Sequence, residues 1–330
     1  MSARAESRVL AAAAALAVLC QPASGASTAQ DGTYPSRPVR LVVPYPSGTG
    51  TDTIARVIGQ RLAERTGASF VVDNRPGGAS IIGIALVAKA LADGYTVLVG
   101  APSLTISPAL QASTPFDVLR DFAPVIRVTS APLVMVVAPQ IGTATLKDFL
   151  ALARSRPGQL NFASGGIGGS IHMGMELLNA MAMIKVVHVP YKGSPQALVD
   201  LLSGQVHAMT NIVSSSLPHI AQGRLVALGV TSPARIPVLP SVPTIAEAGV
   251  PGYELMQWHG LLLPSRTPAA IVRRLEAETR EVMKLAAVRD SLAAQGFDPV
   301  AEGPSAFGAM LKEELVKWAR VVRDSGARPN

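Results

Sequence analysis

Two glycine-rich loops carry most of the residues that can bind a small charged molecule. The first, residues 45–52 (YPSGTGTD), joins a β-branched segment to a segment with helical spacing. The second, residues 164–170 (SGGIGGS), also precedes a helical pattern, and His172 follows it. Glycines let backbone N–H groups turn toward a guest, and the start of a helix adds partial positive charge. Both loops are therefore suited to a carboxylate or a phosphate.

Each loop also has a simpler interpretation. The first is equally compatible with an ordinary strand-to-helix turn in which Asp52 caps the helix. His172 is equally compatible with a packing residue near the start of its helix. These alternatives stay open at the level of the sequence.

A dinucleotide-binding loop is a third interpretation. Gly48-x-Gly50 follows a predicted strand, and Asp73 ends the next strand about twenty residues later, as in the fingerprint for such cofactors. The fingerprint is incomplete, because Thr53 occupies a position that requires glycine or alanine, and Pro46 separates the strand from the first glycine. The alternative function is therefore an NAD-dependent oxidoreductase.

Few residues are arranged for catalysis or for metal binding. The chain has no G-x-S-x-G or H-E-x-x-H motif, and its single cysteine, Cys20, excludes cysteine-based metal sites and disulfides in the body of the protein. Ser170 and His172 are two positions apart on a helix and point to different faces. No metal-ligand spacing connects the histidines, which are His172, His188, His207, His219 and His259. We expect a protein that is not an enzyme and uses no cofactor.

Short strands that alternate with helices must position these loops. In the first part we predict strands at 39–45, 69–72 and 95–99 and helices at 52–66 and 81–91. The pattern resumes with helices at 146–154, 170–181, 195–202 and 214–222 and strands at 159–163, 186–189 and 206–210. The C-terminal part has a strand at 261–264, helices at 269–285, 287–295 and 305–325, and a short extended stretch at 297–300. Such alternation is typical of parallel βαβ units.

Two extended runs divide this α/β pattern. Residues 123–138 read as extended chain interrupted at 130–132, and residues 225–231 form a second run that returns the chain. We therefore predict a discontinuous first domain (30–128 and 232–330) and an inserted second domain (129–231). Loops at the carboxyl ends of the strands would then line a cleft between two lobes.

Residues 1–29 have the pattern of an export signal. A basic start precedes a short apolar run and small residues, so cleavage is expected near Ala26 or Ala29. A lipoprotein anchored at Cys20 is less well supported, because Leu19 stands where a small residue is required. The apolar run is shorter than the roughly 20 residues of a spanning helix. We expect an exported, periplasmic protein.

The composition excludes two further classes of protein. The chain is 48% hydrophobic and 15% charged, which is far from the profile of a disordered chain. Its formal net charge is +7, but no Lys/Arg-rich run is interleaved with aromatic residues. We therefore expect no binding of nucleic acid.

Several of these segments together define a family resemblance. The chain resembles the substrate-binding proteins of tripartite tricarboxylate transporters, the Bug family of bacterial periplasmic receptors, over essentially its whole length after the signal. The resemblance is carried by residues 37–45 (RPVRLVVPY), 74–78 (NRPGG), 92–96 (ADGYT), 121–125 (DFAPV), 164–172, 188–193 (HVPYKG), 217–220 (LPHI) and 243–249 (PTIAEAG).

The resemblance implies a fold, a function and a site. The implied fold is the two-lobed type II periplasmic binding protein fold, with two α/β domains joined by two crossing strands. The implied function is capture of a small organic acid (a dicarboxylate, aromatic or other carboxylate) by a monomer that delivers it to transporter membrane subunits or acts in sensing. The implied ligand-binding residues are Tyr45, Ser47, Gly48, Thr49, Gly50, Asp52, Ser103, Ser164, Gly165, Gly168, Ser170, His172, Tyr191, Lys192, Gly193, Thr210 and Asn211.

Two positions depart from the family pattern. Thr49 replaces the second glycine of the first loop, and Asn211 stands where an aspartate is common. Loss of that fixed negative charge removes a partner for an amino group and a repulsive element against a second carboxylate. The sequence thus favours an acid without an amine.

Overall fold

The computed structural model describes residues 34–328 of the chain. The predicted export signal and the alternative anchor at Cys20 therefore lie outside the described residues. Between residues 34 and 328, no helix combines the length and apolar character needed to cross a membrane.

The first group of strands surrounds the first glycine loop. Strand β1 (Val39–Val43) pairs in parallel with β2 (Phe70–Asn74) and β3 (Thr96–Gly100). Strand β9 (Met256–Pro264) is antiparallel to β3 and to β4 (Phe122–Val137), and β10 (Asp298–Glu302) is antiparallel to β4. The predicted parallel units are thus closed on one side by antiparallel strands.

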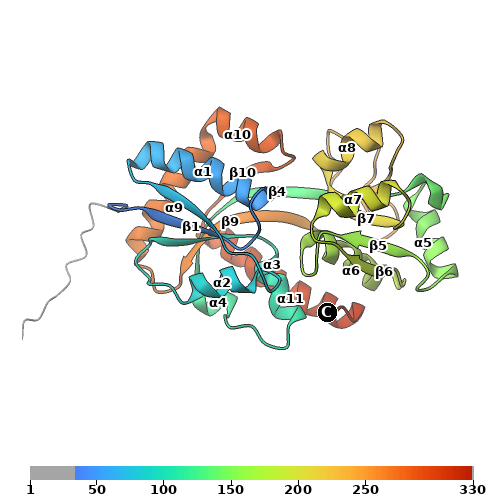
Figure 1. The fold of residues 1–330 in the computed structure, drawn as a ribbon, viewed down its shortest axis with the longest axis horizontal. Coiled ribbons are helices and arrows are strands. Elements are labelled where there is room, and N and C mark those ends of the chain that lie inside the picture. Colours follow the sequence, from blue (N-terminus) through green and yellow to red (C-terminus); the bar gives the residue numbers. More distant parts are fainter. Residues whose placement is uncertain (1–33, 329–330) are drawn as a thin grey trace, which may run out of the picture. The chain divides into compact units, whose positions relative to one another are not determined.

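The second group of strands surrounds the second glycine loop. Strand β5 (Asn161–Ser164) pairs in parallel with β6 (Val187–Pro190) and β7 (Ala208–Ile212). Strands β7 and β8 (Val226–Val230) are antiparallel to the last residues of β4. Strand β4 therefore belongs to both groups, as Figure 1 shows.

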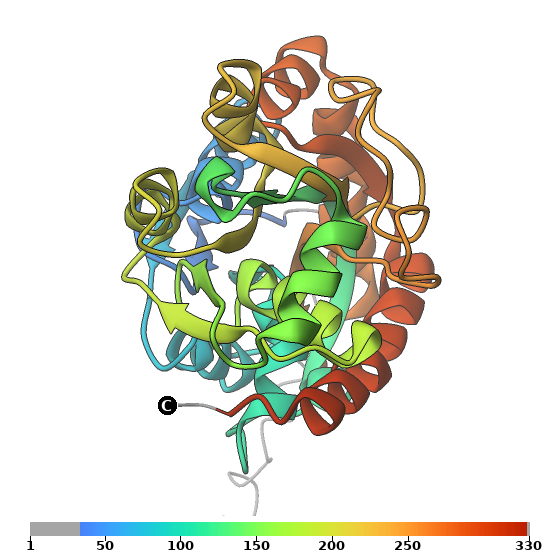
Figure 2. The ribbon, with the colours of Figure 1, turned by 90° about the vertical axis from the view of Figure 1, so that its right-hand side faces the viewer.

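Helices cover both groups of strands. The first group is accompanied by α1 (Gly50–Thr66), α2 (Ile81–Ala88), α3 (Ser103–Leu110), α4 (Val118–Asp121), α9 (Ala269–Lys284) and α10 (Ala286–Ala293). The second is accompanied by α5 (Leu146–Ser155), α6 (Ser170–Ala182), α7 (Ser194–Leu202) and α8 (Val213–Ala221), with a 3-10 turn at Pro139–Ile141. The last helix, α11 (Pro304–Ser325), contacts α3, β4 and α6 and is red in Figure 2.

Local sequence explains where the first helix begins and ends. Ile54, Ile58 and Leu62 recur at helical spacing and are buried, so one face of α1 packs on the core. Gly67 follows the helix with φ of 75° and ends it in the left-handed conformation that glycine adopts at little cost.

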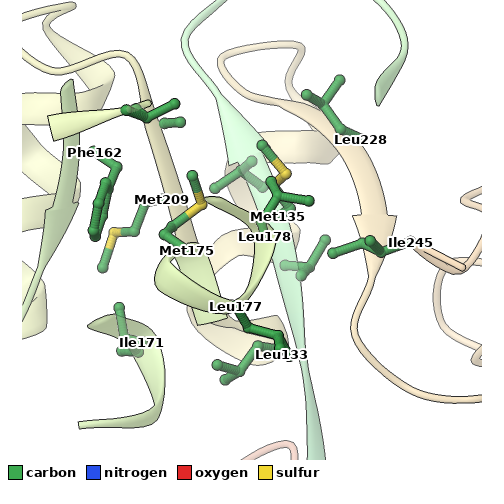
Figure 3. Close-up of a cluster of buried hydrophobic side chains, with 14 of the residues drawn as sticks. Leu133, Met135, Phe162, Ile171, Met175, Leu177, Leu178, Met209, Leu228 and Ile245 are labelled. Atoms are coloured by element: carbon green, nitrogen blue, oxygen red, sulfur yellow. The ribbon is translucent and has the colours of Figure 1, made fainter. Parts of the chain in front are cut away.

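The largest hydrophobic cluster lies around the second group of strands. Figure 3 shows Phe162, Met175 and Met135 packed with neighbours from β4, β5, α6 and β7. The segment between β8 and β9 joins this cluster through Ile245 and Tyr253, and α11 joins it through Trp318. The division into domains at 128/129 and 231/232 stays a prediction.

Two extended segments differ from the prediction. Strand β4 continues without interruption through 130–132, because Ala131 and Pro132 are opposite Gln257 and Met256 of β9. Strand β9 accordingly begins at Met256 rather than at 261. Helix α3, which contains Pro108, was not predicted.

Candidate ligand-binding site

Parallel pairing brings the predicted loops together within each group. Val42 of β1 is opposite Leu98 of β3, so the loop after β1 and the start of α3 lie at the same edge. Ser164 is opposite Pro190, and Phe162 is opposite Ala208, so the loops after β5, β6 and β7 share a second edge. Carboxyl ends of parallel strands are where α/β sheets bind ligands.

Asp52 is the centre of the first loop. Its Oδ2 accepts hydrogen bonds from the backbone N–H of Gly48 (2.9 Å), Nε of Arg56 (3.0 Å) and the hydroxyl of Ser47 (3.2 Å). Its Oδ1 accepts one from Nδ2 of Asn74 (3.0 Å) and pairs with Nη2 of Arg56 (3.0 Å). Both oxygens are used inside the protein, so Asp52 shapes the loop and presents no free oxygen to a guest.

These contacts determine the charge of Asp52. Burial by itself would raise the pKa of this carboxyl, but the hydrogen bonds from Arg56, Gly48 and Asn74 outweigh burial and lower the pKa to about 2. Asp52 is therefore ionised at every physiological pH.

Thr49, and not Asp52, caps helix α1. The hydroxyl of Thr49 accepts a hydrogen bond from the backbone N–H of Asp52 at 3.5 Å and donates one to the carbonyl of Pro46 at 2.9 Å. Gly48 has φ of 84°, a value that side chains disfavour. Gly50 lies against Phe297, whose Cζ would be 2.8 Å from a Cβ at position 50.

Tyr45 and Ser103 form a polar pair beside the first loop. The Tyr45 hydroxyl is 2.5 Å from Oγ of Ser103, the first residue of α3. Burial raises the pKa of Tyr45 and outweighs the opposing hydrogen bonds from Ser103 and Ser80, so the phenol stays neutral. The pair joins the end of β1 to the helix that follows β3.

The second loop is organised by Ser164. Its hydroxyl donates to the carbonyl of Gly166 (2.9 Å) and lies 2.7 Å from Nε2 of His188. Its carbonyl accepts a hydrogen bond from the backbone N–H of Tyr191 (2.9 Å). Ser164 is fully buried, so its hydrogen bonds fix the loop to the interior of the fold.

Two stacked imidazoles support the same loop. Nδ1 of His172 accepts a hydrogen bond from the backbone N–H of Gly168 at 3.2 Å. The rings of His172 and His188 stack with centroids 3.9 Å apart, and Phe162 stacks on His188 at 4.8 Å. Burial, and then the charge of His172, lower the pKa of His188 to about 3. His172 is thus a supporting residue of the loop, in line with its simpler interpretation.

The loop after β6 packs against the second glycine loop. A Cβ at Gly165 would lie 2.5 Å from Oγ and 2.7 Å from the backbone nitrogen of Ser194, the first residue of α7. The hydroxyl of Tyr191 donates to Asp200 (2.7 Å), and burial followed by this carboxylate raises the pKa of Tyr191 to about 12. Lys192 is exposed.

Thr210 and Asn211 point to different partners. The Thr210 hydroxyl donates to the carbonyl of Ile171 in α6 (2.6 Å), so it fastens strand to helix. Nδ2 of Asn211 donates to Oγ of Ser216 (3.1 Å), whereas its Oδ1 is buried with no hydrogen-bond partner within the described chain. A buried polar atom without a partner is costly, so Asn211 has capacity for a further contact.

Residues from the two groups of strands meet at several points. A Cβ at Gly168 would lie 3.3 Å from Cδ1 of Leu110 in α3 and 3.8 Å from Cβ of Ala79. Oγ of Ser170 donates to Oε1 of Gln257 in β9 at 3.5 Å. The second glycine loop therefore contacts α3 and β9, which belong to the first group of strands and its helices.

Sequence reasoning missed several residues of these networks. The contact of Arg56 could have been predicted, because Arg56 lies four positions after Asp52 on one helix, where opposite charges are neighbours. No local pattern indicates the contacts of Asn74, Ser194 and Gln257, because these contacts depend on strand order and register.

The acidic residue of the dinucleotide interpretation is ion-paired within the chain. The carboxylate of Asp73 receives hydrogen bonds from Arg40 and Arg75. Two arginines therefore compete for the oxygens that a ribose hydroxyl would use.

His188 also lines a pocket of about 480 Å³. Its lining comes from α6, from the chain around β6 and from the end of α11, and it includes Glu176 and Lys185. None of its lining residues belongs to the two glycine loops.

Comparison with known proteins gives a consistent result. The family model described as tripartite tricarboxylate transporter family receptor matches residues 54–327. Protein BugT of Bordetella pertussis is 36% identical over 317 residues, which are 96% of this chain and 97% of BugT. Two solved structures from Rhodopseudomonas palustris are similar: Rpa4515 with adipate (35% identity, TM-score 0.80, 90% and 100% coverage) and MatC with bound malate (31%, 0.78, 88% and 100%).

Proposed function

The chain belongs to the tripartite tricarboxylate transporter receptor family, and from this premise we propose that it captures a small organic carboxylate between its two glycine loops. The family resemblance and the two-lobed α/β fold predicted from the sequence are confirmed. The members of the family are binding proteins, so the chain is a receptor and not an enzyme. The oxidoreductase alternative has no support.

The observation that carries the proposal is that the N-termini of three helices lack a capping side chain. Helices α3, α6 and α7 follow the strand ends β3, β5 and β6, and no side chain caps any of them. The first backbone N–H groups of α6 and α7 have no partner within the helix, whereas in α3 those of Leu104 and Thr105 already bond to the carbonyls of Ala101 and Pro102. The dipoles of all three helices favour negative charge at these ends. An anion held by such groups needs no arginine, and bridging waters can complete its contacts.

The bound forms of the relatives suggest the ligand class. Adipate and malate are the acids named for the two similar structures, and both are dicarboxylates without an amine. Asn211 in place of an acidic residue fits the same class, because it adds no negative charge near a second carboxylate. We propose a dicarboxylate or related amine-free acid that the protein collects in the periplasm and passes to membrane subunits or to a sensor.

A thermal-shift screen tests the proposal. The purified protein is heated with adipate, malate, succinate, benzoate, aspartate or NAD, each at millimolar concentration. A ligand at about 100 times its Kd adds roughly 2.7 kcal/mol to the free energy of unfolding and raises the midpoint. We expect shifts with the amine-free acids and none with NAD. A shift with NAD alone, or no shift with any acid, would contradict the proposal.

Restoring a charge at position 211 is expected to weaken binding. In Asn211→Asp a buried carboxylate would face the ligand carboxylate, and we expect dicarboxylate affinity to fall about tenfold, or about 1.4 kcal/mol. Titration calorimetry with adipate and malate measures the change.

The matched control for this exchange is Asn161→Asp. Asn161 lies at the amino end of β5, away from the loops, and is only partly buried. The dicarboxylate affinity of the Asn161→Asp variant should equal that of the parent protein. An Asn211→Asp variant that folds and binds as tightly as the control would show that position 211 is remote from the ligand charge.

A further inference from the structure

A short turn after α10 touches both halves of the candidate site. Oγ of Ser214, in the first turn of α8, donates to the backbone carbonyl of Gln295 at 2.8 Å. Helix α8 packs on β4 and β7, whereas α10 packs on α1, α9 and β10. The hydrogen bond therefore joins a helix of the second group of strands to a turn of the first.

The next residue of the turn, Gly296, lies against the first turn of α8. Gly296 has φ of 80°, and a Cβ there would lie 3.0 Å from Oγ and 3.1 Å from Cβ of Ser214. The conformation and the close approach both require glycine.

The third residue of the turn reaches the first glycine loop. Phe297 is buried, and its Cζ would lie 2.8 Å from a Cβ at Gly50, where α1 begins. On its other side the ring meets His259 edge to face, with centroids 5.2 Å apart. Three consecutive residues, 295–297, therefore connect the first glycine loop to α8, which begins two residues after Asn211.

We propose that residues 295–297 form a strap that holds the two lobes in the ligand-retaining arrangement. This inference rests on the proposed function. Strands β4 and β9 connect the two groups covalently or by pairing and need not separate when the lobes open. The Ser214–Gln295 hydrogen bond has no such link, and the proposal requires it to break when the lobes open. Ser214 and Gly296 are then positioning residues that control release without touching the ligand.

The kinetics of Ser214→Ala test the strap. Loss of one hydrogen bond that exists only in the closed arrangement should speed release of a bound dicarboxylate roughly three- to tenfold, with little change in the association rate. Stopped-flow measurements with adipate separate the two rates. Ser215→Ala is the control, because Ser215 is exposed in the same turn of α8. Equal release rates in the two variants would overturn the proposal.

A second substitution gives an independent readout. In Gly296→Ala the new Cβ would lie 3.0 Å from Oγ of Ser214, so the turn must move away from α8, and adipate release should become at least threefold faster. Gly223→Ala is the control, because Gly223 has a similar φ of 69° and a Cβ there would have no neighbour within 4 Å.

The two proposals can fail separately. If no acid binds to the parent protein, the proposed function fails, and a lower stability of Gly296→Ala than of Gly223→Ala still shows whether residue 296 packs on Ser214 in solution. If acids bind but Ser214→Ala and Gly296→Ala release them at the rates of their controls, only the strap fails.

Discussion

Replacing Gly165 with alanine is expected to have the largest effect of any single methyl group added to the candidate site. The new Cβ would lie 2.7 Å from the backbone nitrogen of Ser194, and backbone cannot move aside as a flexible side chain can. Helix α7 would have to shift away from the second glycine loop. We expect a loss of about 2–3 kcal/mol in the free energy of unfolding and a fall of more than tenfold in carboxylate affinity. Urea denaturation and calorimetry measure the two effects.

Gly169→Ala is the matched control for this substitution. Gly169 belongs to the same loop, has an ordinary φ of −86°, and a Cβ there would have no neighbour within 4 Å. Its stability should stay within about 0.5 kcal/mol of the parent protein. Equal stability of Gly165→Ala and Gly169→Ala would show that α7 does not constrain the loop.

Asp52→Asn is expected to cost about 2 kcal/mol of stability at neutral pH. This value follows from the fall of the pKa of Asp52 from 3.8 to about 2 on folding, at about 1.4 kcal/mol for each pH unit. The asparagine would keep at most part of the contacts with Gly48 and Asn74 and would lose the ion pair with Arg56. Because the first loop depends on these contacts, carboxylate affinity should fall with stability.

The pH dependence of this difference identifies its cause. The folded pKa is below the unfolded one, so the stabilisation by Asp52 is fully present above about pH 4 and is lost as the pH falls through about 2. The parent and Asp52→Asn should therefore converge in stability as the solution becomes acidic. Asp324→Asn, in an exposed ion pair with Arg323, should change stability by less than about 1 kcal/mol at any pH. A difference for Asp52→Asn that does not change between pH 5 and pH 2 would exclude the charge as its origin.

The second loop is supported by His172 and His188, which are far apart in the sequence and have no local relation there. His172 was one of the implied ligand-binding residues and His188 was predicted only to lack metal-ligand spacing, yet their stacking joins the start of α6 to β6 next to Ser164 and Gly168. Their spacing of sixteen residues has no local meaning. It becomes a contact because β5 and β6 pair in parallel with Ser164 opposite Pro190.

The local units of this protein can be read directly from its sequence. Alternating strands and helices, the glycines at 48, 50, 165 and 168 and the family segments are set by neighbours within a few residues, so they can be read in order along the chain. The predicted helices and parallel strands agree with the structure to within a few residues at most ends. The unbroken β4 could not be predicted, because its partner β9 is more than one hundred residues away.

The role of each site residue, by contrast, depends on its partners in the folded chain. Asp52 and Thr210 have the polarity of ligand contacts, but their hydrogen bonds go to Arg56 and Asn74 and to the carbonyl of Ile171. Asn211, by contrast, keeps a buried oxygen without a partner. A polar side chain binds whichever donor or acceptor the fold brings within about 3 Å. That choice depends on strand order and register, which a sequence does not display residue by residue.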